Sequence, residues 1–187
     1  MRKNKKTHIL DVATELFYRD GIQATGVDKI VAEAGVAKMT MYNHFPSKDD
    51  LVLAYLEKRD KEWRSWFEQS VNELATTPKD KIIAIFDVLD SWFKCPDFNG
   101  CAFLNTAAEF TGVSHPFHEA SHKHKKLVKE FILDIVKSTG ILDYKEMADC
   151  IYFLVEGAIV TELLYQKGDS AVKAKVGANL LLSSISE

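Results

Sequence analysis

Residues 38–44 bring together a cation, several hydrogen-bonding groups and a phenol, and they contain no carboxylate. Ammonium, hydroxyl, amide and imidazole groups form hydrogen bonds with the phosphates and base edges of DNA, whereas a carboxylate would repel the phosphates. The candidates for such contacts are Lys38, Thr40, Asn43 and His44, with Tyr42 at the flank. These contacts require a helix that presents the side chains to a groove.

The apolar spacing of residues 27–45 predicts such a helix. It favours a short helix over 27–34 and a second over 38–44. Gly35 between them suits the left-handed backbone of a tight turn, and a helix over 7–19 would brace the pair. This is the spacing of a helix-turn-helix, whose second helix enters the major groove of DNA. A plain helical hairpin in an all-α protein has the same pattern, so both interpretations stay open.

Two further groups of side chains suggest other chemistry. His115, His118 and His122 recur at helical spacing and would suit a transition metal, although histidines near the start of a helix are common without one. Cys95 and Cys101 flank a turn and would suit a redox switch. A reactive thiol needs a nearby cation, and two ordinary thiols are the alternative.

Several motifs of the common enzyme classes are absent from the sequence. It has no Gly-rich phosphate loop, nucleophile elbow or CxxC, and no spacing that joins a nucleophile to a base. We therefore expect a protein that is not an enzyme and has no cofactor.

Composition indicates one globular, mainly helical chain. The 187 residues are 47% hydrophobic and 27% charged, which excludes a disordered chain, and 9 Gly and 4 Pro are too few for many short strands. No apolar run is long enough for a membrane span or an export signal, and three cysteines suggest reduced thiols, so a cytoplasmic location is expected. The net charge is −3, but residues 1–48 carry +3 and residues 49–187 carry −6.

Residues that typically start or end helices recur along the chain and predict an all-α fold of about nine helices and no strands. Ser47 and the Thr77-Pro78 pair read as helix starts, because a hydroxyl caps the first turn and proline suits the first helical position. The remaining helices are expected over 101–110, 114–140, 144–166 and 170–185.

Residues 8–55 resemble the DNA-binding domain of the tetracycline-repressor (TetR/AcrR) family of bacterial transcription regulators. The resemblance rests on many positions in register: Ala13, Leu16, Phe17, Gly21, Thr25, Ile30, Ala34, Gly35, Val36, Thr40, Tyr42, His44, Phe45, Lys48 and Leu51. It implies a helix-turn-helix DNA-binding domain over 1–47 and a larger helical ligand-binding and dimerisation domain over 48–187. It also implies that Thr25, Tyr42 and Lys48 contact the phosphate backbone, and that the chain is a homodimer bound to an operator.

In this family the second domain binds a small-molecule inducer and forms the dimer. The side chains that would line the ligand pocket are Phe86, Phe93, Phe103, Asn105, Glu109, Phe110 and Phe117. Glu109 needs a partner if it is buried, either a lysine or a cationic ligand. Residues 150–165 are apolar on more faces than one core can use, which favours a dimer interface of Ile151, Val155, Ala158, Ile159, Leu180 and Leu181.

The resemblance implies a transcription regulator, most simply a repressor that an inducer of unknown identity releases from DNA. Two alternatives remain at this stage. One is a thiol-based redox sensor on the same scaffold, and the other is a helical ligand-binding or metal-binding protein that does not bind DNA.

Overall fold

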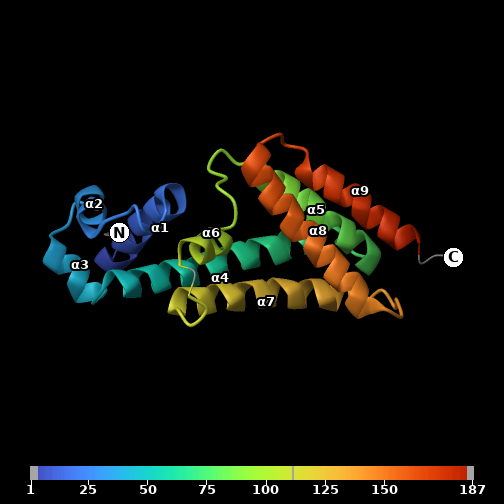
Figure 1. Cartoon of the computed structure of the whole chain (residues 1–187), viewed down its shortest axis with the longest axis horizontal. Helices are drawn as coiled ribbons and strands as arrows, with labels where there is room; N and C mark the ends of the chain where they lie inside the picture. The colour runs from blue at the N-terminus through green and yellow to red at the C-terminus, as the bar shows by residue number, and fades with distance from the viewer. Residues whose placement is uncertain (1–3, 111, 185–187) are drawn as a thin grey trace. The chain divides into compact units, whose positions relative to one another are not determined.

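The computed structural model describes residues 4–110 and 112–184, and within these ranges it contains nine α-helices and no strands (Figure 1). This confirms the all-α prediction. The helices are α1 (Lys5–Asp20), α2 (Val27–Glu33), α3 (Lys38–His44), α4 (Lys48–Leu74), α5 (Pro78–Phe93), α6 (Ala102–Glu109), α7 (Pro116–Lys137), α8 (Tyr144–Tyr165) and α9 (Ser170–Ser183).

The two predicted helix starts are confirmed by their capping contacts. The Ser47 hydroxyl accepts a hydrogen bond from the amide of Asp50 at 3.0 Å, directly before α4. The Thr77 hydroxyl accepts one from the amide of Asp80 at 3.2 Å, and Pro78 is the first residue of α5. Such side chains satisfy amides that have no partner inside the first turn of a helix.

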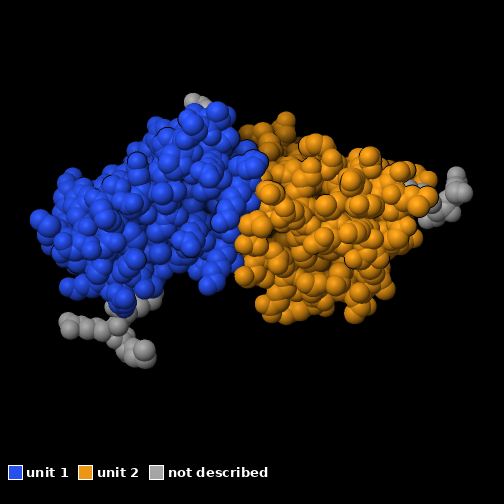
Figure 2. Space-filling model, turned by 90° about the horizontal axis from the view of Figure 1, so that it is seen from below, with its two compact units in different colours: residues 1–62, 101–124 blue, residues 63–100, 125–187 orange. Residues whose placement is uncertain are grey.

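The chain divides into two compact units, shown in Figure 2. Unit 1 consists of residues 1–62 and 101–124, and unit 2 of residues 63–100 and 125–187. Unit 1 therefore contains more than the predicted DNA-binding domain over 1–47, because it also includes the start of α4, all of α6 and the start of α7. The predicted domain boundary is a functional one and stays a prediction.

Helices α1, α2 and α3 pack together at one end of unit 1. Ile9, Ile30 and Met41, one from each helix, have no exposed surface. The His8 ring lies 3.0 Å from the carbonyl of Ala34, so α1 also contacts the end of α2. Gly35 then turns the chain toward α3 with a φ of +61°, which confirms the left-handed turn expected there.

Unit 2 is built around α5, α8 and α9, which pack against one another. Ile85, Val155 and Ala178 from these three helices are fully or almost fully buried. Gly177 of α9 lies against the side chain of Leu154 on α8, where an added Cβ would come within 3.2 Å of it. This absence of a side chain lets the two helices approach closely.

Among the described residues, no helix is both long enough and apolar enough to cross a bilayer.

Candidate functional site

Helix α3 is anchored by one face and exposed on the other. Met41 is fully buried and Phe45, directly after the helix, is 3% exposed, so these two side chains hold α3 on unit 1. The predicted DNA-contacting residues lie on the remaining surface. Lys38, Tyr42 and Asn43 are exposed, and Thr40 and His44 are half-buried.

Met39 also lies on this surface, although it is not among the predicted DNA-contacting residues. Its side chain is 70% exposed at the start of α3. An apolar side chain on a groove-facing helix can contact the methyl group of thymine. Its position beside Lys38 was the signal in the sequence, but the predicted contacts included polar side chains only.

The exposed cation of α3 is paired with an acid on α2. The Lys38 ammonium donates to the Asp28 carboxylate at 2.8 Å, and the Asp28 side chain is 84% exposed. This hydrogen bond raises the pKa of Lys38. A second cluster lies nearby in sequence, where Arg19 and Lys29 both donate to Asp20 and lower the pKa of its carboxyl.

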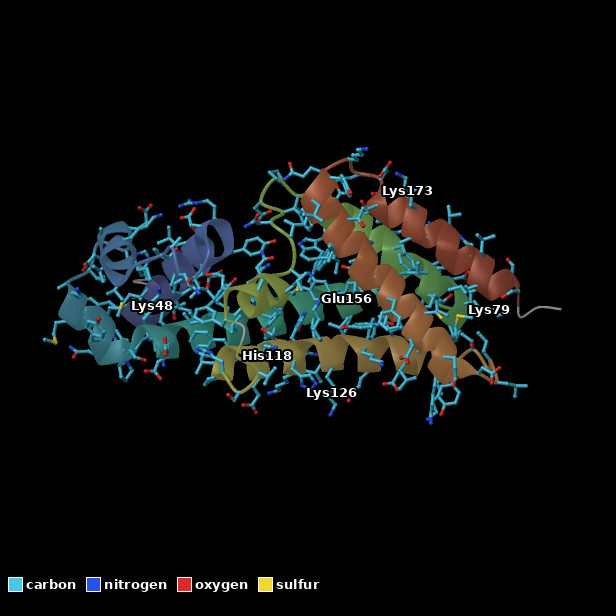
Figure 3. The ribbon with its side chains drawn as sticks, in the orientation of Figure 1. Lys48, Lys79, His118, Lys126, Glu156 and Lys173 are labelled. Carbon is cyan, nitrogen blue, oxygen red and sulfur yellow. The ribbon has the colours of Figure 1, made fainter. Side chains whose placement is uncertain are left out.

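Thr25 and Lys48 both hold the turn between α1 and α2. Thr25 has no exposed surface, and its hydroxyl donates to the Gly21 carbonyl at 2.7 Å. Lys48, labelled at the start of α4 in Figure 3, donates to the Ile22 carbonyl at 2.6 Å. These contacts give both residues a structural role. The expected phosphate contacts of Thr25 and Lys48 stay predictions.

Glu109 also holds the turn between α1 and α2, although it lies far from this turn in the sequence. Its carboxylate accepts hydrogen bonds from the amides of Ile22 at 3.1 Å and Gln23 at 2.6 Å. The Gln23 side-chain amide donates back to the Glu109 carbonyl at 2.6 Å. The partner expected for Glu109 was a lysine or a cationic ligand, and the structure gives it backbone amides instead.

The residues predicted to line a ligand pocket are divided between the two units. Phe86 and Phe93 belong to unit 2, whereas Phe103, Asn105, Glu109, Phe110 and Phe117 belong to unit 1. Within unit 1, Phe103 stacks on His124 with ring centroids 3.7 Å apart, and Phe110 meets Phe117 edge to face at 4.9 Å. The assignment of all seven to one pocket stays a prediction.

A cavity of about 190 Å³ lies elsewhere in unit 2, at the turn between α8 and α9. Its lining residues are Thr161, Tyr165, Lys167, Asp169, Ser170 and Lys173. The buried Glu162 carboxylate beside this turn accepts a hydrogen bond from the Gly168 amide at 2.8 Å, which stabilises the turn. None of these residues was among the predicted pocket residues.

Among the described residues, the histidines and cysteines form no cluster of the kind that a metal site requires. Within residues 4–110 and 112–184, no group of three or more His, Cys, Asp or Glu side chains is placed to hold a metal ion. The His115 ring packs against Phe117 at 4.5 Å. Cys95 is exposed in unit 2, and Cys101 is a buried free thiol of unit 1.

Most of the residues predicted for the dimer interface lie inside unit 2. Ile151, Val155, Ala158 and Ile159 are at most 4% exposed, Leu181 is half-buried and Leu180 is 68% exposed. The first four have almost no exposed surface in the single chain, because they pack in the core between α8 and its neighbours. Their part in a dimer interface stays a prediction.

The exposed apolar residues of α8 and α9 form two stripes. Their members are Phe153, Val160 and Leu164 with Gly157 on α8, and Val172, Val176 and Leu180 on α9. Each stripe follows the three-to-four-residue spacing of one helix side and lies opposite the buried residues of that helix. Because α8 and α9 pack side by side through Leu154 and Gly177, the stripes share one face, which we call the α8/α9 face.

Two short helices joined by a tight turn and packed against α1, with α3 anchored inward and its polar side chains exposed, define a helix-turn-helix DNA-binding regulator. Residues 9–55 match the model of the bacterial regulatory proteins of the tetR family. The structure is similar to that of SCO4454, a TetR-family transcriptional regulator from Streptomyces coelicolor, with 30% identity, a TM-score of 0.91, and coverage of 98% of this chain and 96% of that one. The chain therefore belongs to the TetR family of DNA-binding transcriptional regulators, which are not enzymes.

Two further relatives agree with this family. The HTH-type transcriptional regulator LmrA of Bacillus subtilis is 29% identical over 167 residues, which cover 86% of this chain and 87% of the relative. A TetR transcriptional regulator from Chloroflexus aurantiacus is 27% identical with a TM-score of 0.83, covering 98% of this chain and 97% of that structure.

Proposed function

We propose that this regulator is a repressor that binds its operator as a homodimer and is released by a small-molecule inducer. Helix α3 enters the major groove, where Lys38, Thr40, Asn43 and His44 meet base edges and Tyr42 meets a phosphate. Two copies of α3, one in each subunit, then read successive turns of the DNA.

The observation that carries ligand control is the contact between Glu109 and the turn before α2. Glu109 is the last residue of α6, and its carboxylate holds the amides of Ile22 and Gln23. A ligand that favours another position of α6 weakens these hydrogen bonds. It thereby shifts the population away from the arrangement of α1–α3 that fits DNA.

The dimer is supported by the α8/α9 face. Apolar side chains with more than half of their surface exposed, such as Phe153, Val176 and Leu180, favour burial against a second chain. Gly157 on the same face is exposed and leaves room for a helix of the partner to approach closely. Two such faces related by a two-fold axis form a four-helix bundle.

The test begins with the DNA sequence that the wild-type protein selects from a random duplex library. Binding of that duplex is followed by fluorescence anisotropy while a library of small apolar and cationic compounds is added. We expect at least one compound to release the duplex without unfolding the protein. If no compound releases the duplex, and an oxidant releases it only when Cys95 or Cys101 is present, the redox-sensor alternative is favoured.

A further inference from the structure

The ion pair between Lys38 and Asp28 places a carboxylate on the surface that is expected to face DNA. Lys38 is an exposed cation of α3, and Asp28 lies in the first turn of α2 with its oxygen 2.8 Å from the ammonium. Both side chains are more than half exposed, at 53% and 84%. The pair is therefore not part of the core. Its contribution to the free energy of unfolding is small, because exposed ion pairs stabilise a fold only slightly.

We propose that Asp28 is a specificity-determining residue that withholds Lys38 from DNA of the wrong sequence. A cation strengthens non-specific binding when it neutralises a phosphate and releases a counterion. The paired Lys38 and Asp28 side chains have no net charge, so together they contribute little to non-specific binding of the DNA phosphates. If Lys38 leaves for a phosphate, it leaves the Asp28 carboxylate unpaired beside the polyanion.

On the operator sequence, the base edges offer partners to both side chains, so the Asp28 carboxylate is not left unpaired. Guanine presents the O6 and N7 acceptors that suit an ammonium, and cytosine presents an amino group that suits a carboxylate. Both members of the pair then find partners in the major groove. Asp28 therefore weakens binding to arbitrary DNA more than binding to the operator, and the ratio between the two affinities rises.

The test compares Asp28→Asn with the wild type on two duplexes, the one selected by the wild type and a scrambled duplex of the same composition. One additional phosphate contact per subunit adds two contacts to the dimer, which corresponds to about a sixtyfold gain in affinity at ~0.1 M salt, with a salt slope steeper by about 1.8. We expect Asp28→Asn to show this gain on the scrambled duplex and a gain of at most about twofold on the selected one, which is the small effect of losing an exposed ion pair.

Three variants separate a role through Lys38 from a general charge effect. Glu15→Gln removes an exposed carboxylate from α1 of the same unit and should shift both affinities slightly and equally. Asp28→Glu keeps the carboxylate and should restore most of the selectivity. In a Lys38→Met background, Asp28→Asn should produce a clearly smaller gain on the scrambled duplex, because no ammonium remains to be released.

Two results would overturn the inference. One is an equal gain on both duplexes from Asp28→Asn, and the other is an undiminished gain in the Lys38→Met background. If the wild type selects no sequence at all, the role of α3 in reading DNA fails first, and the role of Asp28 fails with it. Thermal unfolding of each variant, expected to match the wild type, shows that the fold is unchanged.

Discussion

Glu109 and Gln23 are joined by two hydrogen bonds that run in opposite directions. The Gln23 amide donates to the Glu109 carboxylate, and the Gln23 side chain donates to the Glu109 carbonyl, both at 2.6 Å. A side chain at the end of α6 thus serves as a cap for the turn between α1 and α2. The position of that turn, and of the helices that follow it, depends on a residue from a distant part of the sequence.

Replacing Glu109 by Gln should weaken this cap. The amide oxygen can still accept, but the negative charge that strengthens both backbone hydrogen bonds is lost. We expect the free energy of unfolding to fall by about 1–2 kcal/mol and hydrogen exchange at the Gln23 amide to accelerate. Chemical denaturation and exchange measurements check this. Glu119→Gln, an exposed change on α7 of the same unit, is the control and should have almost no effect.

Replacing Lys48 by Met should affect both stability and DNA binding. The hydrogen bond to the Ile22 carbonyl is lost, at about 1 kcal/mol, and the salt slope of binding should flatten by about 0.9 per subunit, or about 1.8 for the dimer, if the same ammonium meets a phosphate. Lys79→Met, on the exposed start of α5 (Figure 3), is the control for charge alone. A loss of stability with an unchanged slope would restrict Lys48 to holding the turn.

Asn43 is the best candidate for a direct base contact, because its amide can bind adenine and its side chain is exposed on α3. We expect Asn43→Ala to weaken binding to the selected duplex by about 1–3 kcal/mol and to leave scrambled DNA almost unaffected. Asn179→Ala, an exposed asparagine of α9, serves as the control. Equal losses on both duplexes would make Asn43 a backbone contact instead.

A charge on the α8/α9 face should separate the subunits without unfolding them. Val176→Asp places a carboxylate on a residue that is 56% exposed in the single chain, so the monomer tolerates it while the dimer has to bury it. We expect monomers in analytical ultracentrifugation, with unchanged helical content and weakened operator binding. Val113→Asp, on an 80% exposed valine of unit 1, is the matched control.

Ala158→Glu, on α8, should give a different result. Ala158 is 4% exposed, so the glutamate would enter the core of unit 2 and unfold it. A stable dimer from Val176→Asp would place the interface on another surface.

The parts of the fold that depend on neighbouring residues could be predicted from the sequence. Ser47 and Thr77 cap amides three residues away, and Gly35 needs a left-handed backbone whatever surrounds it. The inner and outer sides of α8 could not be predicted in the same way. Apolar residues surround most of this helix, so the pattern does not say whether Val155 or Phe153 faces the core.

The candidate site shows the same division. The exposed polar side of α3 follows in part from its helical spacing, because burying Met41 turns Tyr42 and Asn43 outward, and Lys38 is exposed at the first residue of the helix. The partner of Glu109 could not be inferred, since the amide it binds lies 86 residues away in the chain. A carboxylate on an apolar helix signalled that a partner exists, but its identity depends on how α6 packs.

The separation of Gln23 and Glu109 also has a consequence for the newly made chain. Ribosomes add about 5–20 residues per second, so the 86 residues between the two take roughly 4–17 s to synthesise. During that interval helices α1, α2 and α3 leave the ribosome without the carboxylate that caps the turn between α1 and α2. We therefore expect a nascent chain that stops before residue 109 to hold the turn between α1 and α2 less rigidly. The hydrogen bonds of this turn are completed only once α6 has emerged.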